Sequence, residues 1–183
     1  MLQRSSLFLL VFCGMSNAFG QSFTLNTTPL TNEAARTGGC VGIADMDGDG
    51  YDDLILLDQS KNLSIDYQNP DGTYTSFSYG AASGSNQWGM AVGDVDNDGH
   101  KDFVSGGSYD GVHYKAISAR GVSSAWTNLD NGNMFMQCMN MADINNDGDL
   151  DVFGCHDDAA PRHRLHETVL LEHGDGFADR RAA

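Results

Sequence analysis

Short apolar runs alternate with acidic, glycine-containing loops along most of this chain. Three loops each have an apolar run before and after them: Val41–Ala44 and Leu54–Leu57, Met90–Gly93 and Phe103–Ser105, and Met139–Ala142 and Val152–Cys155. Short apolar runs that end at Gly or Asp are typical of buried strands. No segment of ordinary helix length repeats its apolar positions with the helical period of about 3.6 residues. The pattern therefore predicts an all-β protein.

Two further strands are expected after each pair. In the first unit they are Leu63–Tyr67 and Tyr74–Tyr79, joined by a turn at 69–72. The corresponding strands of the later units are expected at Val112–Ile117 and Ser124–Thr127, and at Val169–Glu172 and from Phe177 onward. Four antiparallel strands in each repeated unit are typical of a β-propeller blade. About three such blades are predicted, as a partial or open propeller.

The loops themselves repeat one motif, D-x-[DN]-x-D-G-x-x-D. Its copies start at residues 45, 94 and 143, so they lie 49 residues apart. A fixed period indicates one structural unit used repeatedly. Carboxylates at this density repel one another unless a cation lies between them. Ca²⁺ takes about six to eight oxygen ligands, which alternate residues of a short loop supply. We therefore predict about three bound Ca²⁺ ions.

The ligands of each ion are expected from the same five positions of the motif, with a backbone carbonyl at the fourth of them. They are Asp45, Asp47, Asp49, Tyr51 and Asp53 in the first loop, Asp94, Asp96, Asp98, His100 and Asp102 in the second, and Asp143, Asn145, Asp147, Asp149 and Asp151 in the third. The glycine of the motif permits the sharp turn because it lacks a Cβ. Asn145 is neutral, so the third site has one negative charge fewer.

Two other interpretations of the loops are weaker. An EF-hand needs a glutamate at position 12 and flanking helices, but position 12 is Leu56, Ser105 and Gly154, and the flanks are strand-like. Solvated acidic turns would also be rich in Asp and Gly, but three copies in register would not be expected from turns alone.

The N-terminus predicts export. Arg4, the apolar segment Leu7–Phe12 and small residues near residues 16–20 resemble a secretory signal peptide. The apolar segment is too short to span a bilayer, so we expect no membrane span and a secreted, extracellular protein, or one at the cell surface or in the periplasm. The formal net charge is −15, and nucleic-acid binding is excluded because it needs a basic footprint.

Three cysteines remain beyond the expected signal peptide. Cys138 and Cys155 flank the third loop almost symmetrically, so they either form a cross-strand disulfide or are small buried hydrophobic residues. Cys40 has no evident partner. Four histidines near the C-terminus lack the spacing of a transition-metal site and are interpreted as surface residues: His156, His163, His166 and His173.

The 49-residue period, the metal loop between two strands and the later Asp-Gly turns make the chain resemble the FG-GAP/VCBS repeats of integrin-α-like propellers. The resemblance covers roughly residues 38–179 and implies structural calcium at the ligands named above. It divides the chain into a signal peptide (1–20), a lead-in (21–37) and repeats at 38–86, 87–135 and 136–183. Closed propellers have about four to eight blades, so a fragment of a longer propeller, a homo-oligomer that closes the ring and a short open stack all stay open.

The sequence contains no catalytic motif of the common kinds, so we predict no enzyme. The leading hypothesis is a secreted, calcium-stabilised module for recognition or adhesion that binds an extracellular glycan or protein. This function rests on analogy with the family. The alternatives are a non-catalytic part or fragment of a secreted enzyme and a soluble calcium buffer.

Overall fold

The computed structural model describes residues 24, 40–58, 61–82, 86–130 and 135–157, and the backbone of 165–173 and 176–181. These residues form 14 strands and no helix, which confirms the predicted all-β class. The expected signal peptide lies outside the described residues, and so does the lead-in apart from Thr24.

The first sheet is a four-stranded antiparallel meander. It contains β1 (Val41–Ala44), β2 (Asp53–Leu57), β3 (Asn62–Gln68) and β4 (Tyr74–Ala81), in the order β1-β2-β3-β4. Each strand contains the segment predicted for it. Alternate residues of β2 are buried and those between them are half-buried. Successive side chains point to opposite faces of a strand, and one face of β2 is covered more fully than the other.

The second sheet has the same meander but one insertion. It contains β5 (Gln87–Gly93), β6 (Asp102–Gly107), β7 (Val112–Lys115) and β10 (Thr127–Asp130), in the order β10-β7-β6-β5. Between β7 and β10 a small hairpin is formed by β8 (Ile117–Ala119) and β9 (Val122–Ser123).

The sequence-based prediction was wrong at this insertion, because one strand was expected over 112–117 and the next over 124–127. The backbone leaves the sheet after Lys115 because the next two amides bond elsewhere. Ala116 N donates to Ser124 Oγ at 3.0 Å, and Ile117 N donates to Asp102 Oδ1 at 2.9 Å. Gly121, at φ 77°, then permits the tight turn of the hairpin.

The third sheet contains β11 (Phe135–Ala142), β12 (Asp151–Asp157), β13 (Leu165–His173) and β14 (Gly176–Arg181), in chain order. The strand predicted over 169–172 is the second half of the longer β13. The side chains of β13 and β14, and residue 163, lie outside the described residues, so three of the four C-terminal histidines do too. The fourth, His156, is buried rather than on the surface.

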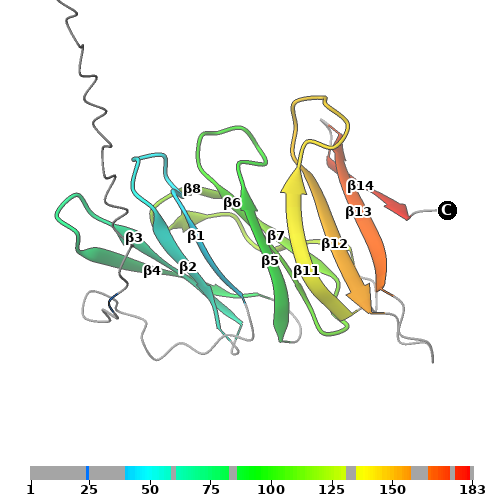
Figure 1. Cartoon of the computed structure of the whole chain (residues 1–183), viewed down its shortest axis with the longest axis horizontal. Helices are drawn as coiled ribbons and strands as arrows, with labels where there is room; N and C mark the ends of the chain where they lie inside the picture. Colours follow the sequence, from blue (N-terminus) through cyan, green and yellow to red (C-terminus); the bar gives the residue numbers. More distant parts are fainter. Residues whose placement is uncertain are drawn as a thin grey trace, which may run out of the picture.

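The three sheets stand side by side (Figure 1). The first strand of each sheet, β1, β5 or β11, is an edge strand of that sheet, and these three inner strands lie next to one another. The three acidic loops lie along one edge of the molecule. Apolar side chains fill the spaces between sheets. Ile55 and Tyr67 of the first sheet share a cluster with Phe103 of the second, and Val104 of the second shares another with Met136 of the third. The described sheets do not close on one another, as expected of a partial or open propeller.

Candidate metal centre

The three acidic loops adopt one conformation, which is fixed by the same hydrogen bonds in each. In all three loops the carboxylate of the first aspartate accepts a backbone N–H from the fifth residue of the motif and another from its glycine, and Asp45 also accepts Gly48 N at 2.8 Å. The oxygen–nitrogen distances are 3.1 and 3.0 Å at Asp45, 3.0 and 3.0 Å at Asp94, and 3.1 and 3.0 Å at Asp143. The loop therefore wraps around its first carboxylate.

Two positions in each loop have a left-handed backbone. The motif glycines have φ of 89°, 93° and 99° at Gly50, Gly99 and Gly148. The residue two positions earlier is also left-handed, with φ of 74°, 58° and 61° at Gly48, Asn97 and Asn146. Gly and Asn are the residues that accept this conformation most readily. This fourth position was missed from the sequence, although its Gly/Asn/Asn pattern was the signal.

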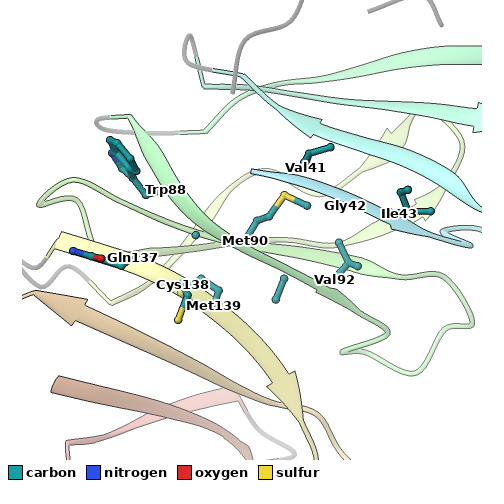
Figure 2. Close-up of a pocket in the computed structure, with 11 residues that line it drawn as sticks. Val41, Gly42, Ile43, Trp88, Met90, Val92, Gln137, Cys138 and Met139 are labelled. Carbon is teal, nitrogen blue, oxygen red and sulfur yellow. The ribbon is translucent and has the colours of Figure 1, made fainter. Parts of the chain in front are cut away.

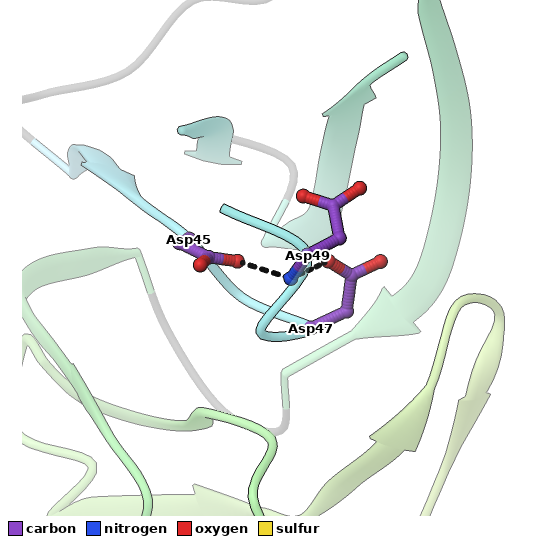
Figure 3. Close-up of side chains that lie close together, drawn as sticks. All are labelled: Asp45, Asp47 and Asp49. Atoms are coloured by element: carbon purple, nitrogen blue, oxygen red, sulfur yellow. Dashed lines mark hydrogen bonds between the residues drawn. The ribbon is translucent and has the colours of Figure 1, made fainter. Parts of the chain in front are cut away.

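Carboxylates converge in the first two loops. One oxygen of each of Asp45, Asp47 and Asp49 lies within 4.8 Å of the others (Figure 3), and the same holds for Asp94, Asp96 and Asp102. Among the described residues these are the only such acidic groups. In the third loop Asn145 Nδ2 donates instead to Asp147 Oδ2 at 2.7 Å.

The ninth-position aspartates brace each loop against its sheet. Asp53, Asp102 and Asp151 are fully buried. One oxygen of each accepts the second residue's N–H, at 2.9, 3.0 and 2.8 Å. The other oxygen of Asp53 accepts the N–H of Gln68, at the end of β3, and the other oxygen of Asp102 accepts the N–H of Ile117, just beyond β7. Both distances are 2.9 Å.

Burial raises the pKa of Asp53 and Asp102, and the backbone donors partly offset that rise. Asp151 Oδ1 is buried and has no hydrogen-bond partner among the described residues. A buried carboxylate oxygen without a donor is costly, so this oxygen favours a cation nearby.

The other predicted ligands lie in the same loops. Asp98 lies outside the converging group of the second loop. At the seventh position the N–H donates to the fifth residue's carboxylate in all three copies, which fixes the peptide group that precedes the seventh residue. The carbonyl of the seventh residue belongs to the next peptide group and stays a predicted ligand. The donors are Tyr51, His100 and Asp149, at 2.9, 2.8 and 3.0 Å.

The first loop also carries a positive charge that the sequence analysis missed. Arg120, at the tip of the β8–β9 hairpin, donates from Nε to Asp47 Oδ2 and from Nη2 to Asp49 Oδ2, the latter at 2.6 Å. Its guanidinium lies 4.9 Å from the ring centroid of Tyr67, and Nη1 donates to Asn69 Oδ1 at 3.1 Å. These contacts join the second repeat to the first loop.

Neighbouring loops touch directly. Lys101 N donates to Met46 O and Lys101 Nζ to Asp45 O, both at 2.9 Å, so the second loop holds the start of the first. Asn97 Nδ2 donates to Asp149 Oδ1 at 3.1 Å, which joins the second loop to the third. The loops therefore form a continuous row rather than three isolated sites.

The family model of the FG-GAP-like repeat matches residues 45–105. The chain carries an FG-GAP-like repeat. The match runs from the first residue of the first loop into β6, so it includes two of the three loops, and it confirms the resemblance to FG-GAP repeats stated from the sequence. No curated protein and no solved structure matches the chain.

No helix in the described part of the chain has the length and apolar character needed to cross a bilayer.

Proposed function

We propose that this chain is a secreted, calcium-stabilised FG-GAP module that binds a glycan or protein outside the cell. The observation that carries the proposal is the convergence of three carboxylate oxygens within 4.8 Å in each of the first two loops. Such a set is unfavourable without a cation. FG-GAP repeats are typical of extracellular proteins, where calcium is abundant enough to fill sites of modest affinity.

The donor set favours calcium over a softer metal. The predicted ligands are carboxylate, amide and carbonyl oxygens, without a cysteine or histidine side chain among them. All-oxygen donors suit hard cations such as Ca²⁺ and Mg²⁺, and flexible acidic loops favour the larger Ca²⁺. When bound, calcium would supply the positive charge that lets the carboxylates stay close together.

The three sites are not equivalent. In the part of the chain that the structure describes, no basic side chain is bonded to the three converging carboxylates of the second loop, whereas Arg120 already pairs with two ligands of the first loop. The third loop has Asn145 in place of an aspartate. We therefore expect the second loop to bind calcium most tightly.

Calcium would stabilise the fold by mass action, since the loop geometry exists only in the folded chain. With free calcium about tenfold above the dissociation constant, each site adds roughly 1.4 kcal/mol, and three add roughly 4 kcal/mol. That is a large part of the net stability of an ordinary domain.

Thermal unfolding in millimolar calcium, in magnesium and in EDTA tests the calcium role. We expect a calcium-specific rise in melting temperature, and we expect Asp96→Ala to lower that temperature in calcium with little effect in EDTA. Asp52→Ala is the matched control, because it removes an exposed carboxylate at a loop position that is not a predicted ligand. Equal melting in calcium and EDTA would overturn the proposal.

Recognition is the second part of the proposal, and we assign it to a groove of about 290 Å³ between β1, β5 and β11 (Figure 2). Val41 and Trp88 line it and are 52% and 43% exposed. An exposed tryptophan beside polar groups such as Gln137 suits stacking on a sugar ring or packing on a protein side chain.

Binding to an array of polysaccharides and extracellular-matrix proteins tests this assignment. Trp88→Ala should abolish the binding of whichever array component is retained, whereas Val122→Ala, at an apolar residue of β9 that is 54% exposed and does not line the groove, should leave it unchanged. Equal binding by both variants would remove the groove from the proposal without affecting the calcium role.

We propose a non-catalytic module, and the surroundings of the acid–base pair formed by His113 and Asp110 support this. His113 is 1% exposed; its Nε2 lies 2.9 Å from Asp110 Oδ2 and its Nδ1 lies 2.7 Å from Asn128 Oδ1. With both ring nitrogens engaged and the ring covered, His113 ties β7 to its neighbours and does not face a substrate. Hydrolysis of a polysaccharide or ester by the purified chain would contradict this.

A further inference from the structure

Two cysteines face each other across the third sheet. Cys138 of β11 and Cys155 of β12 are direct partners in the antiparallel register, and their Sγ atoms lie 2.7 Å apart. Residues 138–142 pair without interruption with residues 151–155. Opposite Cβ atoms of antiparallel strands lie about 4.5–5.5 Å apart and those of a disulfide about 3.5–4.5 Å, so strand pairing alone does not select a disulfide. The Sγ contact does, because it shows that both side chains turn toward each other.

The pair occurs only in one of the three equivalent places. The matching positions are Cys40 and Leu57 in the first repeat, where Leu57 N donates to Cys40 O, and Gly89 and Gly106 in the second. The geometry of the repeat therefore brings these positions together in any case, and the third repeat places a thiol at both.

The other cysteine in the described part of the chain does not compete for either partner. Cys40 is fully buried in the cluster between the first two sheets, and burial raises its pKa to about 11. A thiol that is neither ionised nor exposed is a poor nucleophile. Cys138 and Cys155 are both partly exposed, so a small oxidant can reach them.

We propose that Cys138 and Cys155 form a disulfide that closes the third loop at its base. In the first step the thiolate of one cysteine attacks a sulfur of a small-molecule disulfide such as oxidised glutathione and releases one thiol. The thiolate of the other cysteine then attacks the mixed disulfide and releases the second. Two protein thiols are oxidised, the donor disulfide is reduced to two thiols, and the protons pass to the two leaving thiolates.

The bond would close the third loop at the point where its two flanking strands pair. Residues 139–154 between the cysteines contain the whole third loop, with its neutral Asn145. A disulfide restricts the unfolded chain and so favours the folded loop whether or not a metal is bound. Arg120 holds the first loop and the disulfide would hold the third, so the inference does not depend on calcium.

The test incubates the full chain with either oxidised or reduced glutathione, then alkylates it under denaturing conditions and maps its peptides by mass spectrometry. After oxidation we expect one linked pair, Cys138 with Cys155, with a mass lower by two hydrogen atoms, and a free Cys40. Free Cys138 and Cys155 thiols after oxidation, or a link to another cysteine, would overturn the proposal.

Cysteine-to-serine variants test which two cysteines are linked. After oxidation, Cys138→Ser should leave Cys155 as a thiol or as the unresolved mixed disulfide with glutathione, and Cys155→Ser should leave Cys138 in the same two forms, with no link between protein cysteines. Cys40→Ser should retain the linked pair. A readout without any substitution is the melting temperature of the wild-type chain, which should be higher after oxidation than after reduction, in EDTA as well as in calcium. No difference between the two forms would contradict a bond that closes the loop.

Discussion

At the scale of single residues, the ninth-position aspartates differ from the other acidic residues of the loops. Asp53 accepts two backbone N–H groups while fully buried, so its carboxylate supports the sheet as well as the loop. Among the described residues, the donors to the carboxylates of Asp45, Asp47 and Asp94 come from their own loop or from the Arg120 side chain. Substitutions at the two kinds of position should therefore respond differently to calcium.

Asp53→Asn tests this distinction. The amide nitrogen of the variant would face a backbone donor, which leaves a buried group unsatisfied and costs about 1–3 kcal/mol. We expect this loss in EDTA as well as in calcium, measured by urea unfolding. Asp52→Asn, the exposed neighbour, should change the free energy of unfolding by much less. A loss seen in calcium alone would mean that Asp53 acts only through the metal.

Arg120 offers a second test, because its guanidinium and calcium would neutralise the same two carboxylates. Arg120→Ala should lower the melting temperature more in EDTA than in calcium, since in EDTA nothing else offsets the repulsion between Asp47 and Asp49. Arg120→Lys should restore only part of the loss, because an ammonium group does not form the forked contact. Equal losses in both conditions would mean that Arg120 acts through Tyr67 and Asn69.

These residues show what the sequence could predict about the site. The loop motif is local, so its carboxylates and its glycine could be identified from spacing alone. Arg120 contacts a loop some 71 residues earlier in the chain, and nothing in the sequence links the two. The row of loops was missed for the same reason, because Asn97 and Lys101 meet their partners only when the sheets stand side by side.

At the scale of elements, glycines set how closely the inner strands approach. A Cβ at Gly89 of β5 would lie 2.9 Å from the backbone carbonyl carbon of Cys138 in β11. A Cβ at Gly42 of β1 would come closer still, to 2.7 Å, but its neighbour there is the terminal methyl of Met90, which can move. The backbone of β11 cannot move aside as a flexible side chain can, so a side chain at Gly89 is tolerated less well than one at Gly42.

Gly89→Ala should therefore destabilise the fold by about 1–3 kcal/mol through overpacking, while Gly42→Ala should cost much less. The free energy of unfolding in urea, in calcium throughout, measures both. Because both glycines lie in strands, they share the same change in intrinsic strand preference, and the difference between them reports the contact. Equal effects would show that β5 and β11 can move apart freely.

The strands could be predicted from the sequence where the burial of apolar side chains determines them. The apolar runs on either side of each loop fall within β1 and β2, β5 and β6, and β11 and β12. The prediction was wrong where polar groups decide the path, as at the β8–β9 hairpin, which Ser124 and the buried Asp102 draw out of the sheet. An apolar pattern carries no information about such bonds.

At the scale of the whole molecule, the second sheet lies between the other two and contacts both. Its apolar residues belong to both core clusters, and its loop bonds to the loops on either side. In a linear array of repeats, stability is the sum of the repeats and of the interfaces between neighbours. A change in the middle repeat should therefore weaken both outer ones.

Hydrogen exchange of the full chain in calcium tests this coupling. Asp96→Ala, which removes a ligand of the middle loop, should reduce amide protection in the first and third loops as well as in the second. Asn97→Gly is the control: it keeps the left-handed backbone of this position and removes the side-chain contact to Asp149 but no predicted ligand, so protection should fall mainly at residues 143–151. If Asp96→Ala changed protection only between Gln87 and Gly107, each sheet would open independently. The row of loops would then be a set of neighbours without energetic coupling.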